Sequence, residues 1–108
     1  MRVIFMKKRD QMIMNPITIN VIMVAKPGKE DDLFQEMQKM VAPSRAEKGC
    51  EEYSLHQSVE QQGVLVFYET WQDEQALNDH VETEHYRNYR QKIESLVEKR
   101  EVYRLMKI

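Results

Sequence analysis

The chain has 108 residues and a formal net charge of −2, with 42% hydrophobic and 31% charged residues. This length allows one domain with one modest core, and no apolar run approaches the roughly 20 residues that a membrane-spanning helix needs. Residues 15–108 hold 12 basic against 17 acidic residues, and an acidic domain without a basic patch is a poor nucleic-acid binder, so we expect neither membrane nor nucleic acid as a partner.

Residues 1–14 contain a basic cluster that follows a very short apolar stretch, an order that a secretory signal does not have. We therefore predict that residues 1–14 are an N-terminal extension that need not be ordered, and that residues 15–108 form the domain. Cys50 is the only cysteine and cannot form an internal disulfide. A cytoplasmic location is the simpler expectation for such a chain.

The first half of the domain predicts a strand followed by a helix. Residues 17–24 are rich in β-branched residues and are bounded by proline on both sides, which indicates a short buried strand. Acidic residues then precede an apolar stripe with helical spacing, which is typical of an amphipathic helix lying on a sheet. The stripe consists of Leu33, Phe34, Met37, Met40 and Val41. We expect Pro43 to interrupt this helix and Gly49 to end it.

Two strands with a short glycine-containing loop between them follow. Residues 52–59 and 64–71 alternate in character, and a loop of this kind predicts an antiparallel hairpin. The alternation within residues 64–71 predicts two faces, and both are largely apolar. One face carries Leu65, Phe67, Glu69 and Trp71, and the other carries Val64, Val66, Tyr68 and Thr70.

Two helices and a closing strand complete the predicted order. Asp73 is a good cap for a helix over residues 74–80, and Thr83 can cap a second helix that we expect to continue to about Lys99. Residues 101–108 alternate in the manner of a strand. The order strand-helix-strand-strand-helix-strand is that of a ferredoxin-like α+β fold, an antiparallel sheet with its helices on one face.

The second face of such a sheet has no helix to cover it. In this chain that face carries Val64, Val66 and Tyr68, which would form a large exposed apolar patch on a monomer. We therefore expect a homodimer in which the two sheets face each other.

Three stretches resemble the antibiotic biosynthesis monooxygenase superfamily, whose members are small dimeric α+β barrels. They are Ser44 to Gly49 leading to Tyr53, Glu69 to Leu77 with its E-x-W pattern, and His80 to Tyr86 with two histidines. The resemblance covers about residues 17–107. It implies a quinol monooxygenase, an enzyme acting on phosphorylated autoinducer-2 or a haem-degrading monooxygenase, and it implies that Trp71 lines the substrate cleft.

Trp71, His80 and His85 are the catalytic candidates. Trp71 is either a flat wall for an aromatic substrate or a core anchor, and Glu69 on the same face is either functional or a hydrogen-bonded buried acid. An imidazole titrates near neutrality and can take a phenolic proton, although either histidine could instead fix a helix break. His80 and His85 lie about 140° apart around an unbroken helix, and a break near Thr83 could bring them together. Because no third histidine or cysteine lies nearby, we expect no metal site.

We predict a substrate pocket between the sheet and the helices. Beside the catalytic candidates, its substrate-binding residues would be Phe34, Tyr53, Phe67, Glu69 and Tyr86. No flavin, nicotinamide or phosphate-loop motif is present, so we expect an oxygenase without a cofactor that acts on a small aromatic or quinol. The alternatives are an isomerase or degrader of a small phosphorylated hydroxyketone, disfavoured because few basic residues are expected near the pocket, and a dimeric protein that only binds an aromatic ligand.

Overall fold

The computed structural model describes residues 15–108, and the predicted extension over residues 1–14 lies outside the described residues. Strands and helices alternate in the order expected for the fold. They are β1 (Ile17–Ala25), α2 (Glu30–Lys39), α3 (Val41–Arg45), β2 (Cys50–Gln57), β3 (Val64–Trp71), α4 (Glu74–Val81), α5 (Glu84–Ile93) and β4 (Val97–Leu105).

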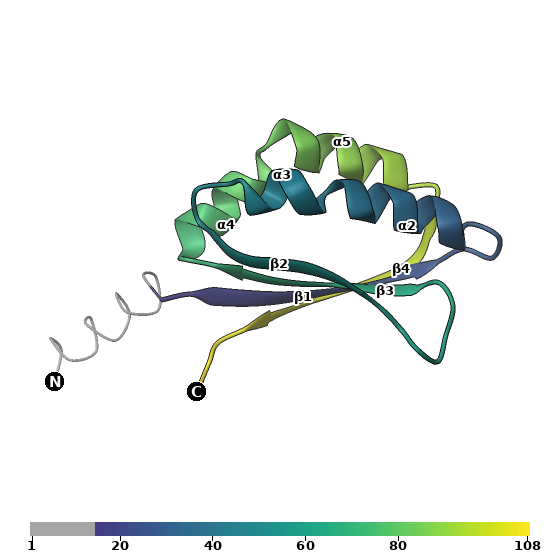
Figure 1. Ribbon diagram of the computed structural model, residues 1–108, viewed down its shortest axis with the longest axis horizontal. Coiled ribbons are helices and arrows are strands. Elements are labelled where there is room, and N and C mark those ends of the chain that lie inside the picture. Colours follow the sequence, from purple (N-terminus) through teal and green to yellow (C-terminus); the bar gives the residue numbers. More distant parts are fainter. Residues whose placement is uncertain (1–14) are drawn as a thin grey trace, which may run out of the picture.

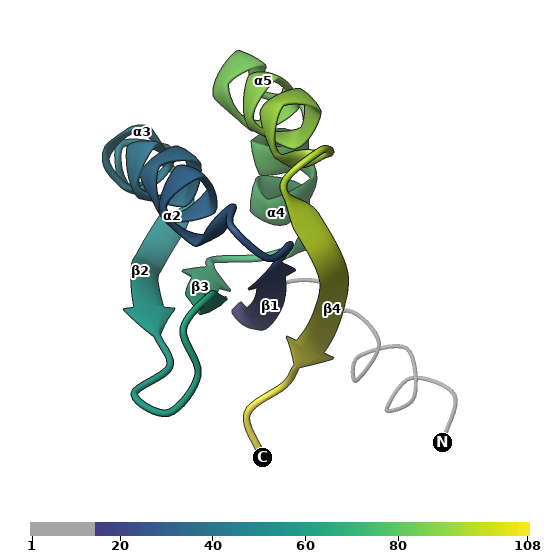
Figure 2. The same ribbon diagram turned by 90° about the vertical axis from the view of Figure 1, so that its right-hand side faces the viewer.

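The strands form one antiparallel sheet in the order β2-β3-β1-β4. The helices of residues 15–108 all lie on the same side of this sheet, with α2 and α3 beside α4 and α5, and no other described element covers the opposite side, the open face (Figures 1 and 2). The predicted ferredoxin-like α+β fold is confirmed. None of the helices in residues 15–108 has the length and apolar character that crossing a membrane requires.

Strand β3 separates the two faces of the sheet as its alternation predicts. Its helix-covered side chains Leu65, Phe67, Glu69 and Trp71 are buried, whereas Val64, Val66, Tyr68 and Thr70 on the open face are half-buried or exposed. The buried set packs with apolar residues of β1, β2 and the helices into a single core. The open face keeps apolar side chains in contact with solvent in the single chain.

The first helix is interrupted at Met40, three residues before Pro43. Proline lacks the N–H that would bond to the carbonyl of Lys39, and its ring collides with that carbonyl, so the break falls one turn earlier than the proline itself. Pro43 therefore lies in the first turn of α3, where a missing N–H is tolerated. The chain then leaves the helices toward β2 and passes Glu47.

The prediction that the last helix continues to about Lys99 is wrong. Helix α5 ends at Ile93, a short turn follows, and β4 begins at Val97, four residues before the predicted strand. The helical spacing of Ile93, Leu96 and Val97 favours a longer helix, but backbone pairing with β1 prevails, and Lys26 donates its N–H to the carbonyl of Leu96. Local propensity is a weak prior against such tertiary pairing. The correction moves Arg100 from a helix end into the sheet.

Candidate active site

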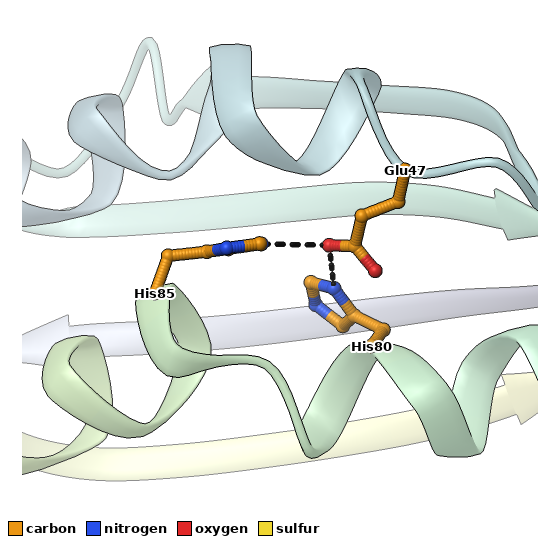
Figure 3. Close-up of side chains that lie close together, drawn as sticks. All are labelled: Glu47, His80 and His85. Atoms are coloured by element: carbon orange, nitrogen blue, oxygen red, sulfur yellow. Dashed lines mark hydrogen bonds and ion pairs between the residues drawn. The ribbon is translucent and has the colours of Figure 1, made fainter.

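Two histidines of α4 and α5 meet one carboxylate from the loop that follows α3 (Figure 3). One carboxylate oxygen of Glu47, Oε2, lies 2.7 Å from His80 Nδ1 and 2.7 Å from His85 Nε2. The side chain of His80 is 2% exposed, that of Glu47 14% and that of His85 29%. The cluster therefore extends from the buried interior at His80 to the surface at His85.

The histidines converge because the helix is broken between them. His80 lies in the last turn of α4 and His85 in the first turn of α5, and Thr83 stands at the break. The Thr83 hydroxyl donates to the carbonyl of His80 at 2.7 Å and accepts from the N–H of Tyr86 at 3.2 Å. Thr83 is thus the helix cap that the sequence predicts, and the break it makes brings the two rings to one acceptor.

Glu47 reaches the histidines because its loop packs very closely on α4. A Cβ atom placed on Gly49 would lie 2.3 Å from the Cβ of Ala76, a distance that atoms do not adopt without displacement. The N–H of Gln72 also donates to the carbonyl of Gly49 at 2.9 Å, which fixes the loop to the end of β3. Glycine at position 49 therefore does more than end a helix, since it allows the approach that places Glu47 beside His80.

The shared carboxylate determines which ring nitrogen of His80 carries the proton. An ionised Glu47 only accepts hydrogen bonds, so a neutral His80 must donate from Nδ1 and keep its lone pair on Nε2. That Nε2 is buried and has no hydrogen-bond partner among residues 15–108. Burial lowers the pKa of His80, while the hydrogen bond to Glu47 opposes the shift. His80 is thus a neutral base at neutral pH with its lone pair unused.

Aromatic rings surround His80. The Trp71 ring lies 4.4 Å from the His80 ring between centroids, and the rings of Tyr86 and Tyr53 lie at 5.1 and 5.7 Å. Trp71 is fully buried, and its Nε1 donates to Glu69 Oε1 at 3.0 Å. Burial raises the pKa of Glu69 to about 7, although the bond from Trp71 opposes this. Glu69 can therefore donate or accept a proton near neutral pH, in the same region as His80.

A cavity of about 210 Å³ opens beside His80 and Glu69, between the sheet and helices α4 and α5. An apolar cavity of about 150 Å³ can hold benzene, so this one has room for a small aromatic compound. Its remaining lining combines apolar side chains with two arginines of β4. These lining residues are Ile19, Val21, Leu77, Asn78, Val81, Tyr86, Arg100, Val102 and Arg104.

Residues 16–92 match the model of the antibiotic biosynthesis monooxygenase family. The chain belongs to this family. It is 34% identical to "Putative monooxygenase YcnE" of Bacillus subtilis over 68% of this chain and 77% of that protein. Its fold matches the crystal structure of PA3566 from Pseudomonas aeruginosa with a TM-score of 0.85, at 33% identity over 89% of this chain and 97% of the other. The structure of Rv0793 from Mycobacterium tuberculosis matches with a TM-score of 0.83, at 29% identity over 87% and 96%.

The predicted site residues of this family member fall into three groups. His80, Glu69 and Tyr86 line the cavity, and His85 joins them through Glu47. Trp71, Tyr53 and Phe67 form the packed wall behind the cavity and are 0 to 2% exposed. Phe34 is not brought to this site, because it lines a separate hollow with residues such as Leu55 and His56 at the β2 edge of the sheet.

Glu47 and Arg100 are the residues that the sequence interpretation missed. Glu47 lies inside the Ser44 to Gly49 stretch, one of the stretches that resemble the family, but no local pattern connects it with histidines 33 and 38 positions away. The predicted extension of the last helix kept Arg100 out of the sheet, and Arg104 lay in the predicted closing strand without being connected with the pocket. Because both line the cavity, the expectation of few basic residues near the pocket is wrong. Cys50, by contrast, has a thiol pKa raised to about 11, chiefly by burial, so it is a poor nucleophile.

Glu47, His80 and His85 also form a set that could hold a metal ion, since their ligand atoms lie within 4.8 Å of one another. Two histidines and a carboxylate bind zinc or non-haem iron in many enzymes. An ion would replace both N–H protons and widen the nitrogen-to-oxygen separations from 2.7 Å to about 3 Å. The hydrogen bonds account for the same convergence, and a chelation experiment separates the two arrangements.

Proposed function

We propose that this protein is a cofactor-independent monooxygenase that oxidises a small phenol or quinol with molecular oxygen in the cavity beside His80. The observation that supports the proposal most directly is the buried, unpartnered Nε2 of His80, with Glu47 bonded to the opposite nitrogen of the ring. A carboxylate that holds one imidazole nitrogen protonated and stabilises the imidazolium is the usual means of making the other nitrogen a general base.

The first step is removal of a phenolic proton from the substrate by His80 Nε2. The imidazolium that forms is stabilised by Glu47, and the phenolate is held among aromatic and aliphatic side chains with little water. Deprotonation makes the substrate a much stronger electron donor, because the negative charge raises the energy of the ring electrons. The protein contributes the base, the binding site and the exclusion of water.

The second step is reaction of the anion with oxygen. The phenolate transfers one electron to oxygen, the two radicals combine into a carbon–oxygen bond, and the peroxide takes up a proton. The O–O bond then breaks, so that one oxygen atom stays on the ring carbon and the other leaves as water. For a quinol the balance is quinol plus oxygen giving hydroxyquinone plus water. The substrate itself supplies all the electrons, so the reaction needs no further reductant.

Glu69 is suited to supply the proton that the peroxide needs. Its pKa of about 7 means that a large fraction of the carboxyl groups is protonated at neutral pH. Trp71 holds one oxygen of this carboxyl group and packs against His80, so we infer that Trp71 positions both groups. Among residues 15–108, the side chain of the half-buried His85 bonds to Glu47 alone, so His85 has the more indirect role of the two histidines.

We further infer that the protein works as a homodimer through the open sheet face. Three large side chains of the open face, Tyr68, Tyr103 and Leu105, are 37 to 48% exposed in the single chain. Pairing two such faces would bury these apolar groups together with the half-buried β-branched residues between them. The cytoplasmic location that the lone cysteine suggests stays a prediction.

The hydroxyketone alternative differs from this proposal in what the cavity must hold, whereas the binding-protein alternative differs only in that the bound aromatic compound does not react. The arginines of β4 weaken the objection that an isomerase would find few basic residues there. The aromatic rings around His80 nevertheless favour an aromatic substrate, because stacked or edge-on rings are the contacts that such a compound gains over a sugar-like one.

Oxygen consumption with a panel of benzoquinols and naphthoquinols tests the proposal. We expect uptake above the autoxidation blank, and with labelled oxygen gas we expect one labelled atom in the product and one in water. No uptake with any member of the panel would overturn it. Thermal stabilisation by the same compounds without turnover would then indicate a binding protein, and turnover of a phosphorylated hydroxyketone would indicate an isomerase.

A further inference from the structure

Strand β4 delivers two arginines to the helix-covered side of the sheet. Arg100 pairs with Met23 of β1 and Arg104 with Ile19, and both partners are buried beneath the helices. Residues directly opposite each other in an antiparallel pair project to the same face. Arg100 and Arg104 accordingly line the cavity beside His80, in a domain whose net charge is otherwise negative.

The two arginines differ in how their charge is satisfied. Arg104 is paired with the carboxylate of Glu74 at the start of α4. Arg100, in contrast, takes part in none of the side-chain hydrogen bonds or ion pairs found within residues 15–108. Its charge nevertheless acts on the cavity, since it opposes the rise in the pKa of Glu69. Arg100 therefore brings an uncommitted positive charge to the cavity.

The chain offers a comparison for what an ordinary surface arginine does. Arg90 donates to the hydroxyl of Tyr86 at 3.0 Å and lies over its ring, and Arg87 is paired with Glu82. An exposed arginine on an edge strand such as β4 can also serve to keep other strands from pairing with it. An arginine that only blocks strand pairing need not line a cavity. Arg100, in contrast, lines a cavity that also contains the imidazole of His80 and the carboxyl group of Glu69.

We propose that the substrate carries a carboxylate beside its phenolic or quinol ring, and that Arg100 binds this carboxylate. This inference rests on the proposed function of the cavity. A guanidinium group presents parallel N–H donors that match the two oxygens of a carboxylate, which provides both attraction and orientation. No other cavity-lining cation is free for this task among the described residues, because Arg104 already has Glu74.

The arrangement gives each part of the substrate a counterpart. The carboxylate meets Arg100 at the β4 side, the ring packs against apolar side chains such as Val21 and Leu77, and the hydroxyl group meets His80. A substrate anchored in this way presents its acidic hydroxyl, and not its carboxylate, to the base. Arg100 is therefore a specificity residue whose removal weakens binding without removing the base.

Binding of a matched pair of quinols under anaerobic conditions tests this proposal without turnover. The acid is 2,5-dihydroxybenzoate and the neutral analogue is 2,5-dihydroxybenzyl alcohol, each measured by isothermal titration calorimetry. We expect the acid to bind at least about tenfold more tightly to the wild-type protein, as charge-assisted hydrogen bonds allow. The preference should decrease with added salt, because the rim of the cavity is accessible to ions.

Three variants assign the preference to one side chain. Arg100→Gln should lose most of the preference for the acid, and Arg100→Lys should keep part of it. Arg87→Gln makes the same change of charge outside the cavity and should keep all of it. Equal binding of acid and neutral analogue to the wild type, or an unchanged preference in Arg100→Gln, would overturn this inference and leave the proposed function standing. Failure of both compounds to bind the wild type would overturn both.

Discussion

The two faces of the sheet are made from the same strands but do different work. On β3, Glu69 and Trp71 turn toward the helices and belong to the candidate active site, whereas Val66 and Tyr68 turn to the open face. On the covered face, burial shifts the pKa values of titratable groups: it raises that of Glu69 and lowers that of His80. The open face holds apolar groups beside exposed polar ones, such as Lys99, Glu101 and Tyr103, which bond to one another in contact with solvent. Alternation along one strand thus separates the candidate active site from the proposed dimer interface.

A second contrast divides the covered face itself. Toward β2, the rings of Tyr53 and Phe67 lie 4.8 Å apart between centroids and are fully buried in the core. Toward β4 the space under α4 and α5 is left partly empty, and the cavity lies there. The cavity occurs where the strand supplies long charged side chains, which extend to the rim instead of filling the interior. The candidate active site and the apolar groups of the open face lie on opposite sides of the sheet. Substitutions on the covered face should therefore change activity, and substitutions on the open face should change assembly.

Removal of the proposed base should have the largest effect on the covered face. We expect His80→Ala to reduce quinol oxidation by about a hundredfold or more, the usual contribution of a positioned general base. Added imidazole should restore part of the rate, measured as oxygen uptake. Gln62→Ala changes an exposed loop side chain away from both faces and should keep most of the wild-type activity. Equal activity of wild type and His80→Ala would remove the base from the proposal.

Glu69→Gln should stabilise the protein at alkaline pH. The folded-state pKa of Glu69 is about 7 against an ordinary value of 4.5, so the cost of a buried charge grows as the pH rises through this window. Glutamine keeps an oxygen for Trp71 and never ionises. We expect a gain of up to about 3 kcal/mol at pH 8 and little difference at pH 4, by urea unfolding of both proteins. The exposed Glu94→Gln should show no such dependence, and a gain that is equal at both pH values would contradict the raised pKa.

Glu47→Gln should reduce the rate, because the carboxylate no longer stabilises the imidazolium, and should move its pH dependence. His80 acts as a base only when neutral, so the rate should rise with pH through its pKa, which burial holds below the ordinary 6.5. Because Glu47 raises that pKa, its loss should move the rising limb of kcat/KM to lower pH. Glu82→Gln alters an exposed carboxylate and should leave the limb in place. A limb that moves to higher pH would contradict the role of Glu47.

A charge on the open face should change assembly. If two sheets pair, the wild-type mass by light scattering should be twice the chain mass of 13.0 kDa, and Tyr68→Glu should halve it. Placing a carboxylate in an apolar interface costs more than the contacts can offset. Gln62→Glu introduces the same charge in an exposed loop and should remain dimeric. A wild-type protein of single-chain mass would contradict the proposed dimer.

Chelation should have no effect if the cluster of Glu47, His80 and His85 is held by hydrogen bonds alone. We expect the rate of the protein dialysed against EDTA to equal that of the untreated protein. Loss of activity that is restored by one divalent metal, and not by others, would instead identify these three residues as its ligands.

The sequence alone determined those features that depend on neighbours along the chain. The alternation of residues 64–71 predicted both faces of β3, and Asp73 and Thr83 predicted the starts of two helices, because period and capping are local properties. The order of elements then predicted the ferredoxin-like sheet, and the E-x-W and two-histidine stretches identified the family. Of the predicted site residues, Glu69, His80 and Tyr86 line the cavity.

Only the tertiary structure decided which distant groups meet. Glu47 joins His80 and His85 because Gly49 lets one loop approach α4, a contact that depends on the absence of a side chain. Arg100 enters the cavity because pairing with β1 ends a helix that local spacing would continue. Hydrogen bonding and packing between segments far apart in the chain carry more free energy than one turn of helical propensity, so they determine where the charged groups of the site lie.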